Sequence, residues 1–572
     1  MCTNFTMEKN EGGHTQVPMQ EDPQILTSAN KIRIYLDKFP KLHNIYLIAT
    51  ISCVSGMMFG FDILSMSAFI GIEQYQNYFN HPNSTMQGLI TSAMALGSLF
   101  GALGTSLISE PFGRRFTLIC CSLSWMIGAA IQSSAQNRTQ LILGRIISGV
   151  GVGFGSTVAP VYGSELAPRR IRGLIGGLFQ FSVTLGILIM YYISYGLHFI
   201  NGVASFRIAW GLQIIPGLLL FFGVIFLPES PRWLAKHGLW DEAEMVVANV
   251  QAKGNRDDPD VNIEVSEIKD QILIDEKSKK ISYATLFNKR YRRRTITAVF
   301  AQIWQQLTGM NVMMYYITVL AAMSGFTGNA NLVFSSIQYV LNVAMTIPAL
   351  FLLDKVGRRK VLLIGAACMG VFQFALAGIL GSYSVPVDSL DGNSYIRILI
   401  PPDRRPAARA AIAMAYLFVC SFASSWGVGI WLYCSEIWGD NAIRQRGAGL
   451  STAANWAFNF AIGMYTPTSF KNITWRTYII YASFCVAMFV HVYFGFPETK
   501  GKRLEEIGQM WDDKIPAWKT SKWQPDIPIL SDKDLHQKME AQHVERGGVI
   551  TQSSSSERNS YGNKVLTTTS GV

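Results

Sequence analysis

Two side chains of opposite charge lie inside long apolar stretches of the sequence, where ionisable groups are rare. Asp62 follows Gly60 and Phe61 near the end of the first stretch, and Arg145 lies in the fourth. A carboxylate at that depth is costly unless it is paired with a cation or protonated. We therefore expect Asp62 and Arg145 to contact each other.

A second set of side chains in the apolar stretches consists of neutral amides and tryptophans. Amides donate and accept hydrogen bonds, and an indole ring offers a flat face, so the set suits a polyol ring. Buried amides that merely join neighbouring helices are the alternative. Gln305 to Asn311 spans under two helical turns and faces one side if the helix stays regular near Gly309, which favours a lined cavity. The set comprises Gln180, Gln305, Gln306, Asn311, Asn342, Trp431, Asn455 and Trp456.

The elements that carry these side chains are predicted to be membrane-spanning helices. The chain has 572 residues, 49% hydrophobic and 15% charged, whereas soluble proteins carry about 25% charged residues. Its mean hydropathy is +0.22, and apolar blocks alternate with short charged loops. Twelve apolar segments are expected, near residues 44–64, 87–108, 117–134, 141–162, 173–196, 208–227, 295–323, 330–353, 361–382, 408–435, 448–468 and 475–496.

The two sets of six segments share sequence landmarks, which indicates an internal duplication. Gly113-Arg114-Arg115 recurs at Gly357-Arg358-Arg359, and Ser164-Glu165 recurs at Ser435-Glu436. Duplicated six-helix halves are typical of major facilitator transporters, which bind substrate midway between the halves. The expected organisation is an N-terminal segment at 1–43, a first half at 44–227, a linker at 228–294, a second half at 295–496 and a largely disordered tail at 497–572.

The distribution of Lys and Arg predicts the orientation of the chain. The formal charge of +11 comes from basic residues in short loops, which fits the positive-inside rule better than nucleic-acid binding. The linker and both termini are then cytoplasmic, and the polar first 40 residues hold no cleaved signal peptide. The glycosylation sequons at Asn83, Asn137 and Asn472 fall on the outer side.

Charged residues at the predicted cytoplasmic helix ends form a third constellation. Ion pairs there could hold the two halves together in one state and break as the halves rock. Arg172 lies seven residues after Glu165, but Ile443 occupies that position after Glu436, so the second-half partner is left between Arg444 and Arg446. The predicted gate comprises Arg114, Arg115, Glu165, Arg172, Arg358, Arg359, Glu436 and Arg444.

Three motifs resemble the signatures of the sugar porter family of the major facilitator superfamily. They are Pro228-Glu229-Ser230-Pro231-Arg232-Trp233-Leu234, Gln305-Gln306-Leu307-Thr308-Gly309-Met310-Asn311 and Pro497-Glu498-Thr499-Lys500-Gly501. The resemblance spans about residues 44–510 and is strongest to fungal high-affinity glucose transporters, which are proton symporters. It implies that the amides and tryptophans bind the sugar, and that Asp62 with Arg145 couples the proton.

The resemblance implies a plasma-membrane hexose transporter that moves glucose with a proton by alternating access, in the lipid bilayer. No cofactor, metal or obligate protein partner is expected. An enzyme is not expected, because Gly149-Val150-Gly151-Val152-Gly153 lies in an apolar helix and fits close helix packing better than a nucleotide loop. A facilitative uniporter, with Asp62 and Arg145 as a static pair, is one alternative. A sugar sensor is another, although only about 75 residues follow Pro497.

One departure from the family pattern concerns the tenth segment. The family has prolines before the tryptophan of this segment, whereas the chain reads Gly427-Val428-Gly429-Ile430-Trp431. Glycines are expected to supply the helix flexibility that proline would otherwise give.

Overall fold

The computed structural model describes residues 34, 36–70, 73–168, 171–197, 199–200, 202–276, 282–326, 329–387, 396–438, 441–502 and 504–524. All structural statements below concern these residues. Within them the chain is almost entirely helical, and its strands are one short antiparallel pair. The predicted all-α membrane fold is confirmed.

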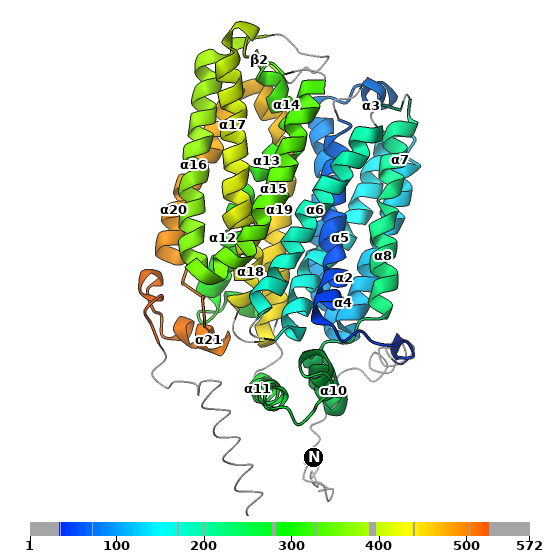
Figure 1. The fold of residues 1–572 in the computed structure, drawn as a ribbon, viewed down its shortest axis with the longest axis vertical. Coiled ribbons are helices and arrows are strands. Elements are labelled where there is room, and N and C mark those ends of the chain that lie inside the picture. Colours follow the sequence, from blue (N-terminus) through cyan, green and yellow to red (C-terminus); the bar gives the residue numbers. More distant parts are fainter. Residues whose placement is uncertain are drawn as a thin grey trace, which may run out of the picture.

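The first half of the chain forms one bundle of long helices, on the right in Figure 1. Its helices are α2 (Ile45–Ser67), α3 (Glu73–Tyr78), α4 (Ser84–Ser133), α5 (Arg138–Leu166), α6 (Arg172–Leu197), α7 (Ala204–Leu212) and α8 (Ile214–Ile225). Helix α4 has 50 residues, about 75 Å at 1.5 Å per residue, which far exceeds a bilayer core of about 30 Å. Its backbone leaves the helical conformation at Gly113, so α4 is two consecutive crossings.

The second half forms the bundle on the left in Figure 1. Its helices are α12 (Arg292–Leu307), α13 (Met310–Tyr315), α14 (Ile317–Met323), α15 (Asn329–Val356), α16 (Arg358–Tyr383), α17 (Arg405–Phe422), η4 (Ala423–Gly427), α18 (Val428–Glu436), α19 (Asn441–Ile473) and α20 (Arg476–Gly495). Consecutive short helices such as α12–α14 and α17–α18 replace single long ones. The pattern of six segments per half follows the predicted apolar segments closely.

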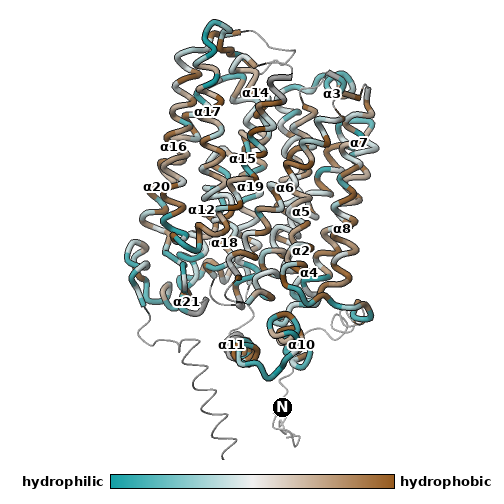
Figure 2. Tube along the Cα trace, viewed as in Figure 1, coloured by the Kyte–Doolittle hydropathy of each residue, from teal (hydrophilic) through white to brown (hydrophobic). Residues whose placement is uncertain are grey.

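Nine helices of the described chain are long and apolar enough to cross a membrane. One of the nine is α4, which supplies two crossings. The interrupted series α12–α14 and the more polar α19 are not among the nine, and they complete a set of twelve. Figure 2 shows the hydrophobic residues gathered along the middle of the bundle and the hydrophilic ones toward its two ends.

Short elements mark the two ends of the bundle. At one end, which we call the linker face, lie α9 (Pro231–Lys236), α10 (Trp240–Gln251), α11 (Pro259–Glu276), η2 (Tyr283–Phe287), α21 (Leu504–Asp512) and η5 (Ala517–Lys519). At the other end, the hairpin face, lie β1 (Val385–Pro386), β2 (Ile398–Leu399) and η3 (Pro402–Arg404). The tail was expected to be largely disordered, but its first part is folded. Helix α21 lies in it and buries Ile507, Met510 and Trp511. Residues 525–572 lie outside the described part.

The glycine run in α5 packs against neighbouring backbone, as its sequence predicts. A Cβ atom at Gly149 would lie 2.1 Å from the Met94 carbonyl oxygen, and one at Gly153 would lie 2.3 Å from that of Ser98. Any side chain at either position would collide with α4. The two helices therefore approach as closely as their backbones allow.

Two helices depart from the regular geometry that the sequence suggests. The condition that the helix stays regular near Gly309 is not met, because Gly309 has a φ of 82° and separates α12 from α13. In the tenth segment, residues Ala423–Gly427 form the π-helix η4 just before Trp431. A π-helix inserts extra backbone into a turn and is frequent at functional sites. Gly427 and Gly429, which stand where the family has prolines, thus lie at the end of this π-helix and in the first turn of α18.

Candidate functional site

Asp62 and Arg145 form an ion pair in the centre of the first half. Nη2 of Arg145 donates to Oδ2 of Asp62 over 2.8 Å, and both side chains are fully buried. The same Nη2 also donates to the Thr91 carbonyl oxygen over 3.1 Å. Within the described residues, Oδ1 of Asp62 accepts no hydrogen bond. The contact predicted between these residues is present, and one carboxylate oxygen is left for another donor.

Close helix packing places Asp62 at this depth. A Cβ atom at Gly60 would lie 2.2 Å from the carbonyl oxygen of Val183, so α2 can approach α6 only because residue 60 is glycine. Asp62 follows two residues later on α2, directed toward α5, which carries Arg145.

The predicted amides of α12 and α19 form one hydrogen-bonded network. Nδ2 of Asn455 donates to Oε1 of Gln305 over 2.8 Å, and Nε2 of Gln306 donates to Oδ1 of Asn455 over 2.9 Å. Asn311 in α13 donates to Oε1 of Gln306 across the helix break. The network brings together four residues predicted to bind the same ligand. Each of these hydrogen bonds can be exchanged for one to a hydroxyl group.

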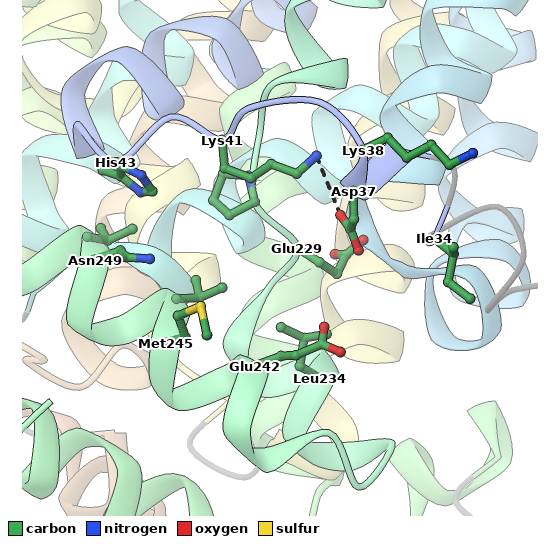
Figure 3. A pocket seen from close by; sticks show the side chains of 13 residues that line it. Ile34, Asp37, Lys38, Lys41, His43, Glu229, Leu234, Glu242, Met245 and Asn249 are labelled. Carbon is green, nitrogen blue, oxygen red and sulfur yellow. Dashed lines mark ion pairs between the residues drawn. The ribbon is translucent and has the colours of Figure 1, made fainter. Parts of the chain in front are cut away.

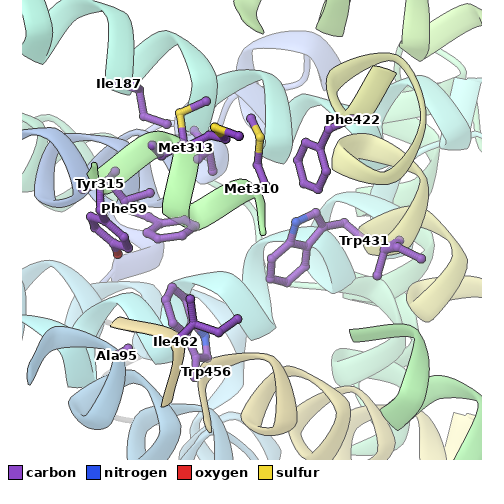
Figure 4. Packing of buried hydrophobic residues seen from close by; sticks show 14 of the residues in the cluster. Phe59, Ala95, Ile187, Met310, Met313, Tyr315, Phe422, Trp431, Trp456 and Ile462 are labelled. Carbon is purple, nitrogen blue, oxygen red and sulfur yellow. The ribbon is translucent and has the colours of Figure 1, made fainter. Parts of the chain in front are cut away.

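The two predicted tryptophans of the second half each meet an aromatic ring of the first half. The rings of Trp431 and Phe179 meet edge to face with their centroids 5.2 Å apart, and those of Trp456 and Phe59 do so at 4.7 Å. Figure 4 shows Phe59, Trp431 and Trp456 near Met310 in the same region. Nε1 of Trp456 donates to Oγ of Ser156 over 3.1 Å. Because Ser156 lies in the first half, this bond joins the two halves at the candidate site.

Two of the predicted ligand residues lie outside this network, in α6 and α15. Two further polar residues, Gln302 and Asn459, lie in α12 and α19 and were not among the predicted ligands. Gln180 in α6 and Asn342 in α15 are both buried, with 9% and 3% of their surface exposed. Gln302 accepts a hydrogen bond of 2.7 Å from Asn455, and Asn459 is buried one helical turn beyond Asn455 with neither side-chain atom bonded to a described residue. The spacing of three or four residues from Gln305 and Asn455 could have revealed both.

Gln305 also contacts the π-helix η4. Its Nε2 donates to the carbonyl oxygens of Trp426 and Gly427, over 3.0 Å and 3.3 Å. Nε1 of Trp426 in turn donates to the Leu362 carbonyl oxygen over 2.8 Å. The irregular turn in the tenth segment is therefore supported by the seventh segment and by α16.

Near the linker face, the first half holds a compact network of charges. Arg114 donates to both carboxylate oxygens of Glu165, over 2.9 Å and 3.0 Å, and Ser230 donates to Oε2 of Glu165 over 2.6 Å. Glu229 accepts from the backbone N–H of Arg114 over 2.9 Å. Burial raises the pKa of Glu229, which lies outside the spanning helices, while nearby Arg115 acts in the opposite direction.

The second half repeats this network at the matching positions. Arg358 donates to Glu436 over 3.0 Å, Thr499 donates to the other oxygen of Glu436 over 2.8 Å, and Glu498 accepts from the backbone N–H of Arg358 over 3.0 Å. Arg359 donates to the Tyr493 carbonyl oxygen over 2.7 Å. The duplicated motifs thus build equivalent contacts, each within its own half.

The halves are joined at the linker face by other residues. Arg446 of α19 pairs with Glu110 of α4 over 2.7 Å. The hydroxyl of Tyr283, in the linker, donates to the Leu103 carbonyl oxygen of the first half over 2.9 Å. Arg446, one of the two open candidates for Glu436, therefore contacts the opposite half. Arg444 is buried at 5% exposure, and the side chain of Arg172 lies outside the described part.

Arg115 contacts the segment that precedes α2. Its Nη1 donates to Asp37 over 2.6 Å, and Lys41 lies 3.4 Å from the same carboxylate. Asp37 and Lys41 line a pocket of about 580 Å³ between this segment and α10, which Figure 3 shows. Burial and the nearby Arg115 lower the pKa of Lys41 to about 8. Arg115 thus braces the first half rather than reaching the second.

The three sequon asparagines are exposed. Asn83 and Asn137 are the N-caps of α4 and α5, where each accepts a backbone N–H over 2.8 Å, and Asn472 lies in the last turn of α19. These helix ends belong to the hairpin face.

Comparison with known proteins places the chain among transporters. Residues 48–511 match the family described as "Sugar (and other) transporter". The chain is 66% identical to the high-affinity glucose transporter 1 of Candida albicans over 517 residues, which cover 90% of this chain and 95% of that one. It is 54% identical to the high-affinity glucose transporter of Kluyveromyces lactis over 501 residues, 87% and 91% of the two chains. The structure of the proton:xylose symporter XylE bound to 6-bromo-6-deoxy-D-glucose superimposes with a TM-score of 0.69 at 25% identity, covering 82% of this chain and 99% of that one.

Proposed function

Because the chain belongs to the sugar transporter family of the major facilitator superfamily and is an integral multi-pass membrane protein, we propose that it carries a hexose, with glucose as the principal substrate, in symport with a proton. It acts at the plasma membrane by alternating access, with the linker face and both termini toward the cytoplasm. The buried pair of Asp62 and Arg145 is the observation that supports proton coupling, and the names of the similar proteins support the sugar.

The amide network supports a sugar as the cargo. A pyranose ring carries hydroxyls that donate and accept, and the side chains of Gln305, Gln306, Asn311 and Asn455 offer both kinds of group within one cluster. Trp431 and Trp456 add flat faces for the apolar side of the ring. When sugar binds, its hydroxyls replace the bonds that these amides make to one another. When sugar leaves, the amides bond to one another again, so few polar groups are left unpaired.

Proton coupling follows from the chemistry of the buried pair. In the present state the charge of Asp62 is balanced by Arg145 at 2.8 Å. A proton that enters from outside can neutralise Asp62 and release Arg145, which keeps its bond to the Thr91 carbonyl oxygen. A proton that crosses with 100 mV of membrane potential supplies about 2.3 kcal/mol, enough to concentrate a sugar about fiftyfold.

Alternating access requires contacts that open at one face while the other face closes. The pair of Arg446 and Glu110 joins the two halves at the linker face, so it must break before sugar can leave on that side. The bond from Tyr283 to Leu103 ties the linker to the first half at the same face. The networks around Glu165 and Glu436 stay within single halves and give each half a fixed base for this motion.

A cell suspension tests the proposal directly. The full-length chain is expressed in cells that lack hexose transporters, and labelled glucose uptake and external pH are followed together in unbuffered medium. Symport predicts sugar uptake with alkalinisation of the medium that begins on addition of glucose. Uptake without alkalinisation would contradict symport and favour a uniporter, and failure to restore any uptake would contradict transport and favour a sensor.

A further inference from the structure

The segment α12–α13 carries three of the eight proposed sugar ligands, and its helix is broken between them. Gln305 and Gln306 lie at the end of α12, and Asn311 lies in α13 beyond the break at Thr308 and Gly309. Each residue of a helix turns the chain by about 100°. The direction in which Asn311 points relative to Gln306 therefore depends on the geometry of the break. A contact that holds the backbone at the break in one geometry therefore also sets the relative positions of Gln306 and Asn311.

The side chain of Gln373 in α16 satisfies a carbonyl group that the break releases. In a continuous helix the Thr308 carbonyl would accept the N–H of Val312, but this N–H donates to the Gly309 carbonyl oxygen instead. Nε2 of Gln373 donates to the Thr308 oxygen over 2.7 Å, and Gln373 is 1% exposed. A backbone carbonyl without a partner inside a bilayer would be strongly unfavourable. The broken conformation is therefore stabilised by this one amide.

Side chains of neighbouring helices pack directly against the backbone at Gly309. A Cβ atom there would lie 2.8 Å from Cγ of Tyr481 and 3.1 Å from Nε2 of Gln373. Gly309 also has a φ of 82°, which L side chains rarely adopt. Gln373 and Tyr481 come from α16 and α20, which lie side by side at the outer edge of the second half in Figure 1. The break thus rests on two helices that supply none of the proposed sugar ligands.

A second glutamine side chain donates a hydrogen bond to the backbone near a second break in the same segment. The chain leaves helical geometry again at Tyr316, between α13 and α14. Nε2 of Gln338 in α15 donates to the Met313 carbonyl oxygen, three residues earlier, over 2.9 Å, and Gln338 is fully buried. Helix α13 is therefore held at both ends by glutamine side chains from neighbouring helices.

We propose that Gln373 is a positioning residue of the sugar site, assisted by Gln338, which holds the broken seventh segment in the geometry that aims Gln306 and Asn311 at the sugar. This inference rests on the proposed function. Gln373 acts on the sugar only through the backbone of Thr308. Without it, the break relaxes toward a continuous helix and Asn311 turns away from Gln306.

The test compares substitutions that remove the amide but keep the size of the side chain. In Gln373→Met, the KM for labelled glucose is expected to rise about fivefold, equivalent to about 1 kcal/mol, with less than a twofold change in maximal rate per molecule at the cell surface. The dissociation constant of glucose, measured by tryptophan fluorescence of the purified full-length protein, should rise by the same factor. Gln338→Met should give a smaller rise in both.

Gln132→Met is the matched control. Nε2 of Gln132 donates to Oγ of Ser148 over 3.1 Å between α4 and α5, and the residue is equally buried, but it does not contact the seventh segment. Its KM should equal that of the wild type. An equal rise in the control, or an unchanged KM and dissociation constant in Gln373→Met, would overturn the inference.

The experiment distinguishes an error in the proposed function from an error in the role assigned to Gln373. A wild-type chain that neither binds nor transports glucose contradicts the proposed function, whereas a working wild type with a normal Gln373→Met variant contradicts only the positioning role. If Gln373→Met does not reach the surface, Gln373→Asn replaces it. Its amide is one methylene shorter and cannot span the distance to Thr308, so the same rise in KM is expected and a normal KM again refutes the role.

Discussion

Nη2 of Arg145 lies 2.8 Å from Oδ2 of Asp62, and neither side chain is exposed. A buried charge without its partner is strongly destabilised, so the fate of each group depends on the other. The pair lies in the first half of the chain, whereas most of the proposed sugar ligands lie in the second. The proposed coupling between proton and sugar therefore has to pass through the contact of the two halves, where Nε1 of Trp456 donates to Ser156.

Replacing Asp62 by asparagine is expected to uncouple transport. The side-chain amide of the Asp62→Asn variant cannot take up a proton, so glucose should equilibrate across the membrane without accumulating, while exchange of labelled for unlabelled glucose persists. Accumulation ratio and exchange rate are measured on the same cells. A variant that still concentrates glucose would show that Asp62 does not carry the coupling proton.

Asp512→Asn is the matched control for this substitution. Asp512 pairs with Arg290 over 2.9 Å, but both side chains are largely exposed, and such surface pairs contribute little. Accumulation should be the same as in the wild type. A loss in this variant would mean that any removal of an acidic group impairs uptake.

Removing the amide of Gln305 should weaken sugar binding. The wild-type side chain bonds to Asn455 and to the Trp426 carbonyl oxygen, and these groups lose their partner in Gln305→Ala. The loss of about 1–1.5 kcal/mol predicts a KM about tenfold higher. Initial uptake rates over a range of glucose concentrations provide the measurement, with surface abundance as the control. A KM within twofold of the wild type would indicate that Gln305 only joins helices.

Hydropathy predicted an all-helical membrane protein, because burial in a bilayer acts on every residue of a spanning helix, and the helices observed are consistent with the twelve segments expected. It also predicted the contact of Asp62 with Arg145, since two isolated charges in apolar helices have few other partners. The duplicated landmarks predicted matching charges at Glu165 and Glu436 that would hold the two halves together. The structure forms matching pairs there, but each pair joins residues of a single half.

The sequence could not reveal features that depend on contacts between distant segments. The helix break at Gly309 needs a donor for the Thr308 carbonyl, and that donor, Gln373, comes from a helix without a recognised motif. The partner of Arg115 proved to be Asp37, in a polar segment that carries no pattern. The spacing of four residues from Asn455 indicated that Asn459 lies on the same helix face, and only its burial needed the structure.

The conformation of Gly113 should be essential for stability. Its φ is 90°, and a Cβ atom there would lie 2.5 Å from Oε2 of Glu229, the carboxylate whose Oε1 accepts the N–H of Arg114. Gly113→Ala should therefore cost about 1–3 kcal/mol and lower both the melting temperature and the surface abundance. Gly104→Ala in the same helix is the control, because its nearest neighbour would be 3.8 Å away. Equal stability of the two variants would contradict the strain at Gly113.

Breaking the pair of Glu110 and Arg446 should favour the state that is open at the linker face. The pair joins α4 to α19 over 2.7 Å with both side chains 24% exposed, so it should contribute about 0.5–1 kcal/mol to the closed state. In Glu110→Gln or Arg446→Gln, a cysteine introduced at buried Ala453 should react about two to five times faster with a thiol reagent in inside-out vesicles. The charge-exchanged double variant, Glu110→Arg with Arg446→Glu, should restore the slow rate. Asp512→Asn, which breaks the exposed pair between Arg290 of the linker and Asp512 of the tail, should leave it unchanged. If the exchange fails to restore protection while the single variants lose it, the two residues act separately and do not form a latch.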